Sequence, residues 1–549
     1  MDSDKTKLPN EGSSPTADWG EDDSPDATAV DEDEGLEVEE PKPTQVTLDS
    51  RWLWGLLVLA IVAVAAALRL YDLARQSMWL DELFTANVVG GGPQLTLGRI
   101  MNGDTNPPLH YLLQSLVSLR WARTEFSLRI LPAIFGIMGT AAMYFAGATL
   151  FDRKTGAWAA GLFSVSVVAI EFAQEARMYS LMMLCAALVL WALGALIRKP
   201  GPVNALLLGV AMALLAYSHV YGYVAAPMLL VAVILVPRLR KRIGWSMLVT
   251  YPVLAVLFVP WVFAIPAQIA FVQRQATAGN WWMSTPDDLI GSLVHYVGLY
   301  APGKDVLSGL LFFVLLATGF VQSSNKVTCE ASEDGKRSAV TEGDVRWALL
   351  ALMALPVLAG IVVSYYVTPI STIRNTLVGL PAAYLLAVHG AFKFKKPFGV
   401  IALVALVIGA ALSLPAYYKS DSKGHWKDAL TMWGEEDATG ALAEDWTSAS
   451  NVDSYRTITH SRRQGDMLWL SDAGNSAGLT GQILPDNTKL LLSEWLNRYE
   501  RVVVISQTED SWLFKHMDEE TGWKPGGVSK FGNPYVHVYV RSAESSATQ

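Results

Sequence analysis

Long apolar stretches recur along this chain, and short polar segments separate them. A helix needs about 20 mostly apolar residues to cross a bilayer. The pattern that follows the polar N-terminus therefore predicts a polytopic α-helical membrane protein with about 11 transmembrane helices. The predicted spans are 52–71, 127–150, 155–173, 178–197, 202–218, 221–237, 246–266, 305–322, 346–367, 373–391 and 397–417.

The basic residues of the short loops give the topology. Lys and Arg are enriched in cytoplasmic loops. A shorter apolar helix at 107–121, which begins with Pro107-Pro108, decides on which side these loops fall. If the N-terminus is cytoplasmic and 107–121 does not cross, all four basic loops are cytoplasmic. We therefore predict that 107–121 is a juxtamembrane or partly inserted helix. The four loops contain Arg153-Lys154, Arg198-Lys199, the RLRKR run from Arg238 and the KFKK run from Lys393.

The same topology places three segments on the extracytoplasmic side, namely the loops 72–126 and 267–304 and the region 419–549. The C-terminal region has the composition of a soluble domain and is predicted to be a small α/β domain, separate from a transmembrane domain over 49–418. The polar loop 323–344 is predicted to be a cytoplasmic linker. In the C-terminal region the strand-like runs are Met467–Leu470, Val502–Ile505 and Tyr535–Val540, and Lys489–Tyr499 is helical in pattern.

The composition indicates lipid exposure for most of the chain. Hydrophobic residues make up 52% and charged residues only 17%, whereas soluble proteins contain about 25% charged residues. The formal charge of −9 comes from residues 1–48, which hold 15 Asp or Glu against 3 Lys, so the other 501 residues sum to +3. This acidic tail is too polar to bury a core and is predicted to be disordered and cytoplasmic. No nucleic-acid partner is indicated.

An acidic pair, Asp81 and Glu82, follows the first predicted span. Adjacent carboxylates beside the bilayer can deprotonate a hydroxyl or hold a divalent cation. With Glu175 they are candidate ligands for such a cation, although no spacing requires one, and no other cofactor is expected. The two cysteines, Cys185 and Cys329, are too few for a Cys-based metal site. Alternatively, the acidic pair marks a helix N-terminus, where carboxylates interact favourably with the helix dipole.

A second group of candidates, Glu175, Arg177 and Tyr179, lies between the third and fourth predicted spans. Ionisable residues at membrane depth are costly and are functional by default. On a helix, residues two apart do not face each other, so Glu175 and Arg177 are expected to have different partners. Alternatively, Arg177 extends its side chain toward the membrane interface, as long basic side chains near helix ends do.

Arg374 lies on the extracytoplasmic side by the predicted topology, against the usual bias of basic residues. An arginine there requires an anion, and a lipid phosphate suits its guanidinium group. The alternative is an ion pair with Asp287 or Asp288. Arg69, near the end of the first span, is expected to pair with Asp72 or to position the loop. Weaker candidates, for which a structural hydrogen bond is the commoner role, are Asn106, His110, His219, Tyr221 and His295.

Six motifs strengthen these candidates in combination. They are LRLYDLARQSMWLDELFTAN from Leu68, NPPLHYLL from Asn106, EFSLRILPAIFG from Glu125, QEARMYSL from Gln174, TPISTIRNTLVGLPAAYLL from Thr368 and YYKSDSKGHWKDAL from Tyr417. Together they resemble the GT-C superfamily of integral-membrane glycosyltransferases, which use polyprenyl-phosphate sugars. The most similar groups are bacterial relatives of the protein O-mannosyltransferases and the lipid A aminoarabinose transferase. The resemblance is strongest over 52–220 and excludes the acidic tail and most of the C-terminal domain.

The resemblance implies roles for single residues. In this superfamily an acidic residue of the first external loop is the catalytic base, or contacts the acceptor or a metal, which corresponds to Asp81 with Glu82 beside it. Basic residues on external loops bind the carrier phosphate, which suggests Arg177 and Arg374. The aminoarabinose transferases have a lysine where this chain has Asn106, so one phosphate contact is missing. The remaining expected substrate contacts are Glu175, Tyr179 and His110.

The predicted function is therefore that of a glycosyltransferase in the plasma or inner membrane. It moves a sugar from a polyprenyl-phosphate carrier to a hydroxyl of a lipid, glycan or protein acceptor, with inversion and with Asp81 as base. Arg177 and Arg374 would stabilise the leaving phosphate. The alternatives are a transporter or flippase for a lipid-linked saccharide, a scaffold that binds envelope glycans, and an oligosaccharide transferase. A transporter favours charges near the bilayer midplane, whereas the charges here gather at the ends of spans.

Overall fold

The computed structural model describes a large part of the chain after the acidic tail. The described residues are 50–277, 303, 306–321, 325–331, 338–367, 372–433, 439–443, 451–452, 454–455, 458, 467–469, 492, 495–507, 509–519, 523–528 and 534–542. The predicted disorder of residues 1–48 therefore falls outside them, as do His295, Asp287 and Asp288.

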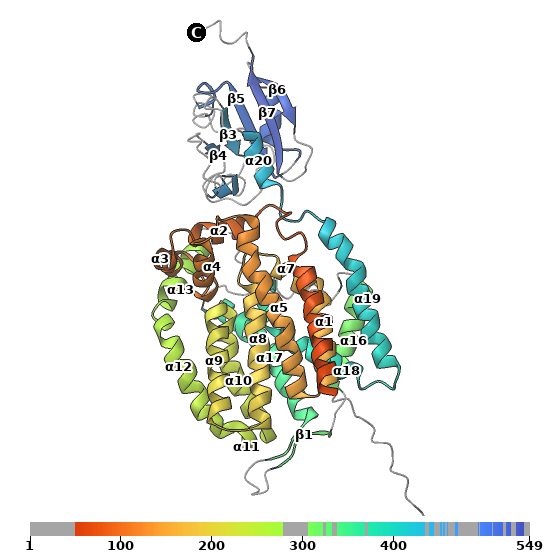
Figure 1. Cartoon of the computed structure of the whole chain (residues 1–549). Coiled ribbons are helices and arrows are strands. Elements are labelled where there is room, and N and C mark those ends of the chain that lie inside the picture. Colours follow the sequence, from red (N-terminus) through yellow and green to blue (C-terminus); the bar gives the residue numbers. More distant parts are fainter. Residues whose placement is uncertain are drawn as a thin grey trace, which may run out of the picture. The chain divides into compact units, whose positions relative to one another are not determined.

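A bundle of apolar helices forms most of the structure (Figure 1). Each predicted span corresponds to helical structure, which confirms a polytopic helical membrane protein. Among the described residues, six helices are long and apolar enough to cross a membrane, or seven if α6 and α7, which bend by 62°, count as one span; α9, α10 and α16 are shorter. The total of about 11 spans stays a prediction. The bundle helices are α1 (Ser50–Leu70), α5 (Glu125–Leu150), α6 (Arg153–Val165), α7 (Val167–Ala173), α8 (Tyr179–Arg198), α9 (Pro202–Ser218), α10 (Val220–Leu235), α12 (Met247–Val262), α16 (Val306–Val321), α17 (Glu342–Tyr366), α18 (Leu380–Ala391) and α19 (Phe398–Lys419).

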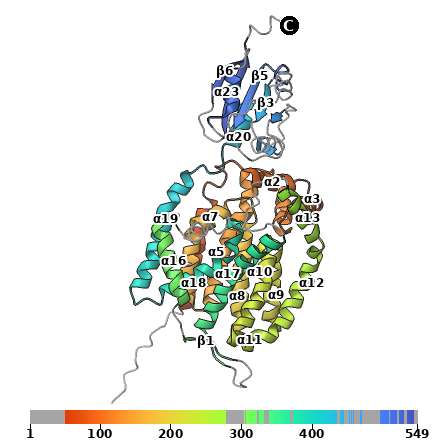
Figure 2. The same cartoon turned by 180° about the vertical axis from the view of Figure 1, so that it is seen from behind.

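The helix α8 is the centre of the bundle. In the most apolar 18-residue stretch of α8, 83% of the residues are buried, whereas only 11% are buried in the corresponding stretch of α1. Helix α8 packs against α5 and α9. In the view of the bundle from behind, α10 lies beside α17 (Figure 2). Small residues allow close packing nearby, since a Cβ atom on Gly147 of α5 would lie 2.5 Å from the Cα atom of Gly156 in α6. A helix that is apolar all round and buried suits the core of a membrane bundle, and an exposed apolar helix suits contact with lipid.

Three short helices cover one end of the bundle, which we call the α2–α4 end (Figure 1). They are α2 (Leu80–Val88), α3 (Pro93–Gly103) and α4 (Leu109–Ser118), and α13 (Ile265–Thr277) packs against α3. At 1.5 Å per residue, α4 is about 15 Å long, half of the hydrocarbon thickness of about 30 Å. This short length agrees with the prediction that 107–121 does not cross, which stays a prediction.

The four basic loops meet at the opposite end, which we call the basic end (Figure 1). Ion pairs join Lys326 to Asp152 at 3.8 Å and Lys393 to Glu342 at 3.1 Å. Arg242, in the short helix α11 (Pro237–Ile243), donates to the carbonyl oxygen of Arg198 at 3.4 Å. The predicted grouping of the basic loops on one side is thus confirmed. The linker between α16 and α17 adds an antiparallel pair, β1 (Val327–Cys329) and β2 (Val340–Thr341).

The C-terminal region contains a mixed five-stranded sheet with the order β4-β3-β5-β7-β6. The three predicted strands are present as β4, β5 and β7. The other two were missed because the β3 segment TGALA and the β6 segment WKPGGV contain Gly or Pro, which are depleted in strands. Within the predicted helix at Lys489–Tyr499 the structure describes Leu492 and residues 495–499, of which Leu492, Trp495 and Leu496 are helical. The elements are α20 (Trp426–Trp433), β3 (Thr439–Ala443), β4 (Met467–Trp469), β5 (Arg501–Ser506), α23 (Trp512–Glu519), β6 (Trp523–Val528) and β7 (Tyr535–Arg541).

Candidate active site

The two adjacent carboxylates of the first loop have different surroundings. Both lie in the first turn of α2, so the helix N-terminus expected as the alternative is present. The Asp81 side chain is 35% exposed, whereas the Glu82 side chain is fully buried. Successive residues of a helix point in directions about 100° apart, so one carboxylate faces the open side while the other faces the protein. The pair therefore does not form a single two-carboxylate site.

Glu82 is held in a buried ion-pair network. Arg129, from α5, donates to both carboxylate oxygens at 2.8 Å, and the Nζ of Lys423 lies 3.1 Å from Oε2. The backbone N–H of Ala176 also donates to Oε1 at 2.8 Å. Burial alone raises the pKa of Glu82, but the charges of Arg129 and Lys423 outweigh it and lower the pKa to about 2. Glu82 therefore stays ionised and fixes α2 against distant parts of the chain.

Two arginines converge on the exposed carboxylate of Asp81. The Nη1 atom of Arg374 lies 3.5 Å and the Nε atom of Arg177 lies 3.9 Å from its Oδ2 atom. Arg374 also lies over the ring of Trp79, with its guanidinium carbon 4.5 Å from the ring centroid. Asp81, Arg177 and Arg374, which sequence analysis selected from three separate segments, are thus brought together. The alternative partners of Arg374, two aspartates of the 267–304 loop, lie outside the described residues.

Arg177 is buried and its guanidinium group contacts protein groups, which favours a role in the site over an extension toward the membrane interface. Its Nη1 atom donates to the hydroxyl of Tyr111 at 3.1 Å, to Oγ1 of Thr85 at 3.4 Å and to the carbonyl oxygen of Asp81 at 3.4 Å. Burial opposes its charge, but Tyr111 and Asp81 raise the pKa of Arg177 well above its ordinary value. Its segment lies between α7 and α8 and is not helical, yet Glu175 and Arg177 do have different nearest partners, as expected.

Glu175 is a buried carboxyl group beside this cluster. Its Oε1 atom lies 4.0 Å from Nη1 of Arg374 and has no hydrogen bond within the described part of the chain. Burial raises the pKa of Glu175 to about 7, although the charges of Lys423 and Arg374 oppose the shift. Lys423, whose side chain is 13% exposed, also donates to the carbonyl oxygen of Gln174 at 3.2 Å. Sequence reasoning missed Lys423, although it lies within one of the six motifs.

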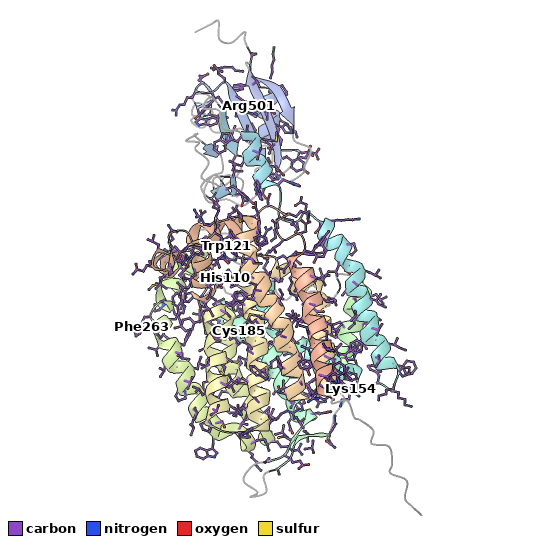
Figure 3. The ribbon with its side chains drawn as sticks, in the orientation of Figure 1. His110, Trp121, Lys154, Cys185, Phe263 and Arg501 are labelled. Carbon is purple, nitrogen blue, oxygen red and sulfur yellow. The ribbon has the colours of Figure 1, made fainter. Side chains whose placement is uncertain are left out.

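A second polar cluster, made of Asp104, Asn106 and His110, lies beside Tyr111 at the α2–α4 end. Figure 3 labels His110 there. Both ring nitrogens of His110 are buried without a hydrogen bond within the described residues, and burial with the charge of Arg177 lowers its pKa to about 3. Asn106 donates to Oδ1 of Asp104 at 3.3 Å, and its own Oδ1 atom is unpaired in the described structure. His110 is therefore a neutral side chain. Asp104 was missed because no motif singled it out.

The other expected residues have different surroundings, and Tyr179 lies beside Arg374 of the Asp81 cluster. Tyr179 begins α8, and its ring lies 5.6 Å from that of His219. His219 accepts the backbone N–H of Tyr221 at 3.1 Å and caps α10, as its alternative role predicted. The expected pair of Arg69 with Asp72 is wrong: Arg69 donates to the carbonyl oxygens of Ser164 at 2.9 Å and Phe163 at 3.0 Å, while Asp72 pairs with Arg75 at 3.3 Å.

The three acidic candidates do not form a set of metal ligands. Within the described residues no three His, Cys, Asp or Glu side chains are grouped so as to hold a metal ion. The physical reason lies in the buried network, because Arg129 and Lys423 occupy both oxygens of Glu82. The cation hypothesis built on Asp81, Glu82 and Glu175 is therefore not supported by these positions.

Comparison with known proteins agrees with the resemblance in the motifs. ArnT from Cupriavidus metallidurans in the apo state has a TM-score of 0.52 at 12% identity, over 90% of this chain and 99% of that chain. The Archaeoglobus fulgidus oligosaccharyltransferase in complex with Zn and sulfate has a TM-score of 0.51 at 14% identity, over 89% of this chain and 73% of that chain. The chain has the GT-C fold.

Two further comparisons refine this GT-C assignment. Residues 105–263 match a family model described as dolichyl-phosphate-mannose-protein mannosyltransferase. ArnT bound to undecaprenyl phosphate matches with a TM-score of 0.51 at 12% identity, over 90% of this chain and 99% of that chain. A comparison with curated proteins finds no match. The family model covers less than a third of the chain and includes Arg177 but neither Asp81 nor Arg374, so the likeness over the whole chain is one of fold.

Proposed function

We propose that this protein is a membrane glycosyltransferase that moves a sugar from a polyprenyl phosphate to an acceptor hydroxyl. The observation that carries the proposal is the convergence of Arg177 and Arg374 on the half-buried carboxylate of Asp81. A carboxylate that is accessible beside two guanidinium groups combines a base with a binding site for an anionic leaving group. The similar fold of ArnT, whose structure is bound to undecaprenyl phosphate, supports a lipid-phosphate donor.

The proposed reaction is a single displacement with inversion. Asp81 accepts the proton of the acceptor hydroxyl, whose oxygen attacks the anomeric carbon. The bond from that carbon to the phosphate oxygen breaks, and its electron pair leaves with the polyprenyl phosphate. The leaving phosphate is already an anion, so it requires positive charge rather than a general acid. Arg374, 41% exposed, and the buried Arg177 supply that charge.

The donor phosphate has a second effect in this proposal. Before it binds, both guanidinium groups face Oδ2 of Asp81. A phosphate that binds between them competes with Asp81 for their charge and leaves the carboxylate free to accept a proton. Glu82 takes no part in proton transfer and instead fixes the position of α2 through Arg129 and Lys423. Binding of the donor thus prepares the base for the acceptor.

We place the site on the extracytoplasmic side of the cell membrane. The basic loops gather at the end of the bundle opposite to α2–α4 (Figure 1), and basic loops favour the cytoplasmic side. The N-terminal tail is then cytoplasmic. A transporter is less well supported, because a midplane binding site formed by broken helices is its usual feature, whereas the charges around Asp81 lie at one end of the bundle.

The direct test is transfer of radiolabelled sugar in vesicles that contain the purified protein and a series of polyprenyl-phosphate donors. Product extraction then separates lipid, glycan and protein acceptors. Asp81→Asn should reduce the transfer rate by about 10²- to 10⁴-fold, the usual contribution of a general base. Asp72→Asn, which removes an exposed acid of the same loop, is the matched control and should retain the rate. Transfer by Asp81→Asn at the wild-type rate would exclude Asp81 as the base.

A further inference from the structure

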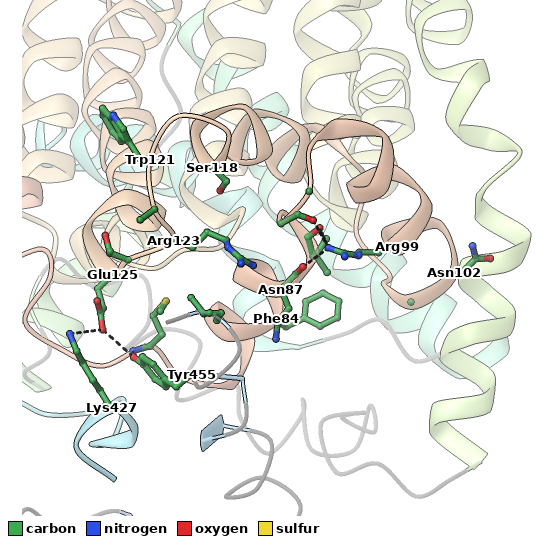
Figure 4. A pocket seen from close by; sticks show the side chains of 18 residues that line it. Phe84, Asn87, Arg99, Asn102, Ser118, Trp121, Arg123, Glu125, Lys427 and Tyr455 are labelled. Carbon is green, nitrogen blue, oxygen red and sulfur yellow. Dashed lines mark hydrogen bonds and ion pairs between the residues drawn. The ribbon is translucent and has the colours of Figure 1, made fainter. Parts of the chain in front are cut away.

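A large cavity opens beside α2, along the same helix that carries Asp81. Its volume is about 1090 Å³, slightly above the usual range of about 300–1,000 Å³ for ligand pockets. It lies between α2, α3 and the segment before α5, and Lys427 and Tyr455 contribute from the C-terminal region (Figure 4). The hydroxyl of Tyr455 also contacts the backbone N–H of Met78.

Two arginines extend toward each other across this cavity (Figure 4). Arg99 donates through Nη1 to the carbonyl oxygens of Asn87 and Gly90, both at 2.6 Å, and Arg123 donates through Nη1 to that of Ala86 at 3.0 Å. Burial, together with the charge of Arg99, lowers the pKa of Arg123. The two positive charges therefore repel each other while backbone carbonyls hold them in place.

Neither arginine pairs with a carboxylate among the described residues. The acidic residue of the cavity, Glu125, is engaged by Lys427 at 3.3 Å and by the hydroxyl of Tyr455 at 3.4 Å. Capping of the C-terminal carbonyls of α2 explains part of the arrangement. It uses only Nη1 of each arginine and leaves the other N–H groups of both without a hydrogen bond in the described structure. Arg99 is exposed and Arg123 is half-buried, so these groups are open to solvent, and a bound anion would replace water there and offset the repulsion.

The rest of the lining is mixed, because apolar side chains such as Phe84, Val88 and Ile458 lie beside polar groups that can bind sugar hydroxyls. Side-chain amides of Asn87 and Asn102 and the hydroxyl of Ser118 line the cavity, and each can donate and accept hydrogen bonds. The ring of Trp121, which is 53% exposed, offers an apolar face at the rim. Asp81 does not itself line the cavity, but Phe84 and Val88 do, and they lie three and seven residues after Asp81 on the same side of α2, with Val88 about 10 Å further along the axis. A short saccharide is long enough to cover that interval.

We propose that this cavity binds an anionic saccharide acceptor whose carboxylate or phosphate group pairs with Arg99 and Arg123. The proposal rests on the function proposed above, since it makes the cavity the acceptor side of the reaction at Asp81. The terminal sugar of the acceptor then presents its hydroxyl to Asp81, and the charged group further along the acceptor fixes its register.

The test measures binding without turnover, by calorimetry on protein in neutral phosphatidylcholine nanodiscs. The probes are trigalacturonic acid and its methyl ester, which have the same backbone with and without charge. Wild-type protein should bind the acid about tenfold or more tightly, which corresponds to about 1.4 kcal/mol. Arg99→Gln combined with Arg123→Gln should abolish the preference, because glutamine still donates to the backbone carbonyls but has no charge.

Two single substitutions test whether binding of the acid depends on where the guanidinium charge lies or only on the total positive charge nearby. A Cβ atom at Gly90 would lie 2.5 Å from Nη1 of Arg123, so Gly90→Ala displaces that guanidinium group and should weaken binding of the acid alone. Arg120→Gln removes an exposed arginine that does not line the cavity, and should leave the preference unchanged. Equal binding of acid and ester by the wild type, or an equal loss in Arg120→Gln, would overturn the proposal.

Further arms identify the anion and separate this proposal from the catalytic one. Phosphorylated mannotriose, compared with mannotriose, tests phosphate in place of carboxylate.

If nanodiscs with phosphatidylglycerol abolish binding of the acid, and the double variant no longer retains this lipid, the cavity is a lipid head-group site and the proposal is wrong. If the acid binds in a charge-dependent way but no donor supports transfer, the proposed function fails while the cavity assignment stands. If transfer occurs with equal efficiency to acid and ester, the proposed function stands and the cavity is not the acceptor site.

Discussion

The two ends of the helix bundle use charge in different ways. At the basic end two cations of the ion pairs are well solvated, since the side chains of Lys326 and Arg238 are 66% and 57% exposed, whereas Lys393 is 17% exposed. At the α2–α4 end Arg129 and Glu82 are 2% and 0% exposed. Exposed pairs contribute little and are screened by salt, whereas buried charges must be paired completely. The first arrangement suits an orientation signal in the membrane, and the second suits a site whose groups must hold fixed positions.

The largest expected effect comes from breaking the buried pair. Arg129→Met leaves the Glu82 carboxylate buried without its bidentate partner, so the free energy of unfolding should fall by about 3–5 kcal/mol. Thermal unfolding in detergent measures this loss. Adding Glu82→Gln to Arg129→Met should recover part of it, because the unpaired charge is removed. If the single variant were as stable as the wild type, the contrast between the two ends would be wrong.

The next effect concerns the binding of the donor. Arg374→Gln removes a guanidinium group 3.5 Å from Asp81, so KM for the polyprenyl-phosphate donor should rise about 10- to 100-fold, the range for a hydrogen bond to a charged group. Arg374→Lys keeps the charge without the planar fork and should recover part of the affinity. Steady-state transfer kinetics distinguish the three proteins. An unchanged KM in Arg374→Gln would show that the donor phosphate binds elsewhere.

A pH dependence should follow from Glu175, whose pKa is raised to about 7. Below pH 7 the Glu175 carboxyl group is mainly neutral and does not compete with the donor phosphate for Arg374. KM for the donor should therefore be lower at pH 6 than at pH 8. Glu175→Gln should remove this difference. Because burial disfavours the ionised form of Glu175, the native state loses stability as pH rises from about 4.5, the ordinary pKa, to about 7, so Glu175→Gln should also raise Tm more at pH 8 than at pH 5. A KM that depends on pH equally in both proteins would contradict the assignment.

The smallest effect is expected at the basic end. Arg238→Gln removes an exposed pair with Asp344 at 3.5 Å, so the free energy of unfolding should change by less than about 1 kcal/mol. That change should diminish further in high salt, because solvated charges are screened. The transfer rate should not change. A loss as large as that of Arg129→Met would mean that the two ends do not differ in this way.

The sequence predicts the helices and one half of the site well, for a physical reason. Spans follow from the length of apolar runs, and the basic loops follow from charge counts, both of which are local. Asp81, Arg177 and Arg374 were found because charged residues beside apolar runs need an explanation. The burial of Glu82 was not predictable, since its partner Lys423 lies 341 residues further along the chain. The wrong partner for Arg69 has the same origin, because local spacing suggested Asp72 while its real contacts come from α6.

The contact between Lys423 and Glu82, which are 341 residues apart in the chain, has a consequence for biosynthesis. A nascent chain exposes Glu82 and Glu175 to their surroundings long before residue 423 leaves the ribosome. Until then the acidic groups have one cation fewer, and Glu82 relies on Arg129 alone. The site therefore reaches its final charge only after α19, the last helix of the bundle, has been inserted. Incomplete translation products that end before this lysine lack one of the two cations that hold Glu82, so α2 should be fixed less firmly in them.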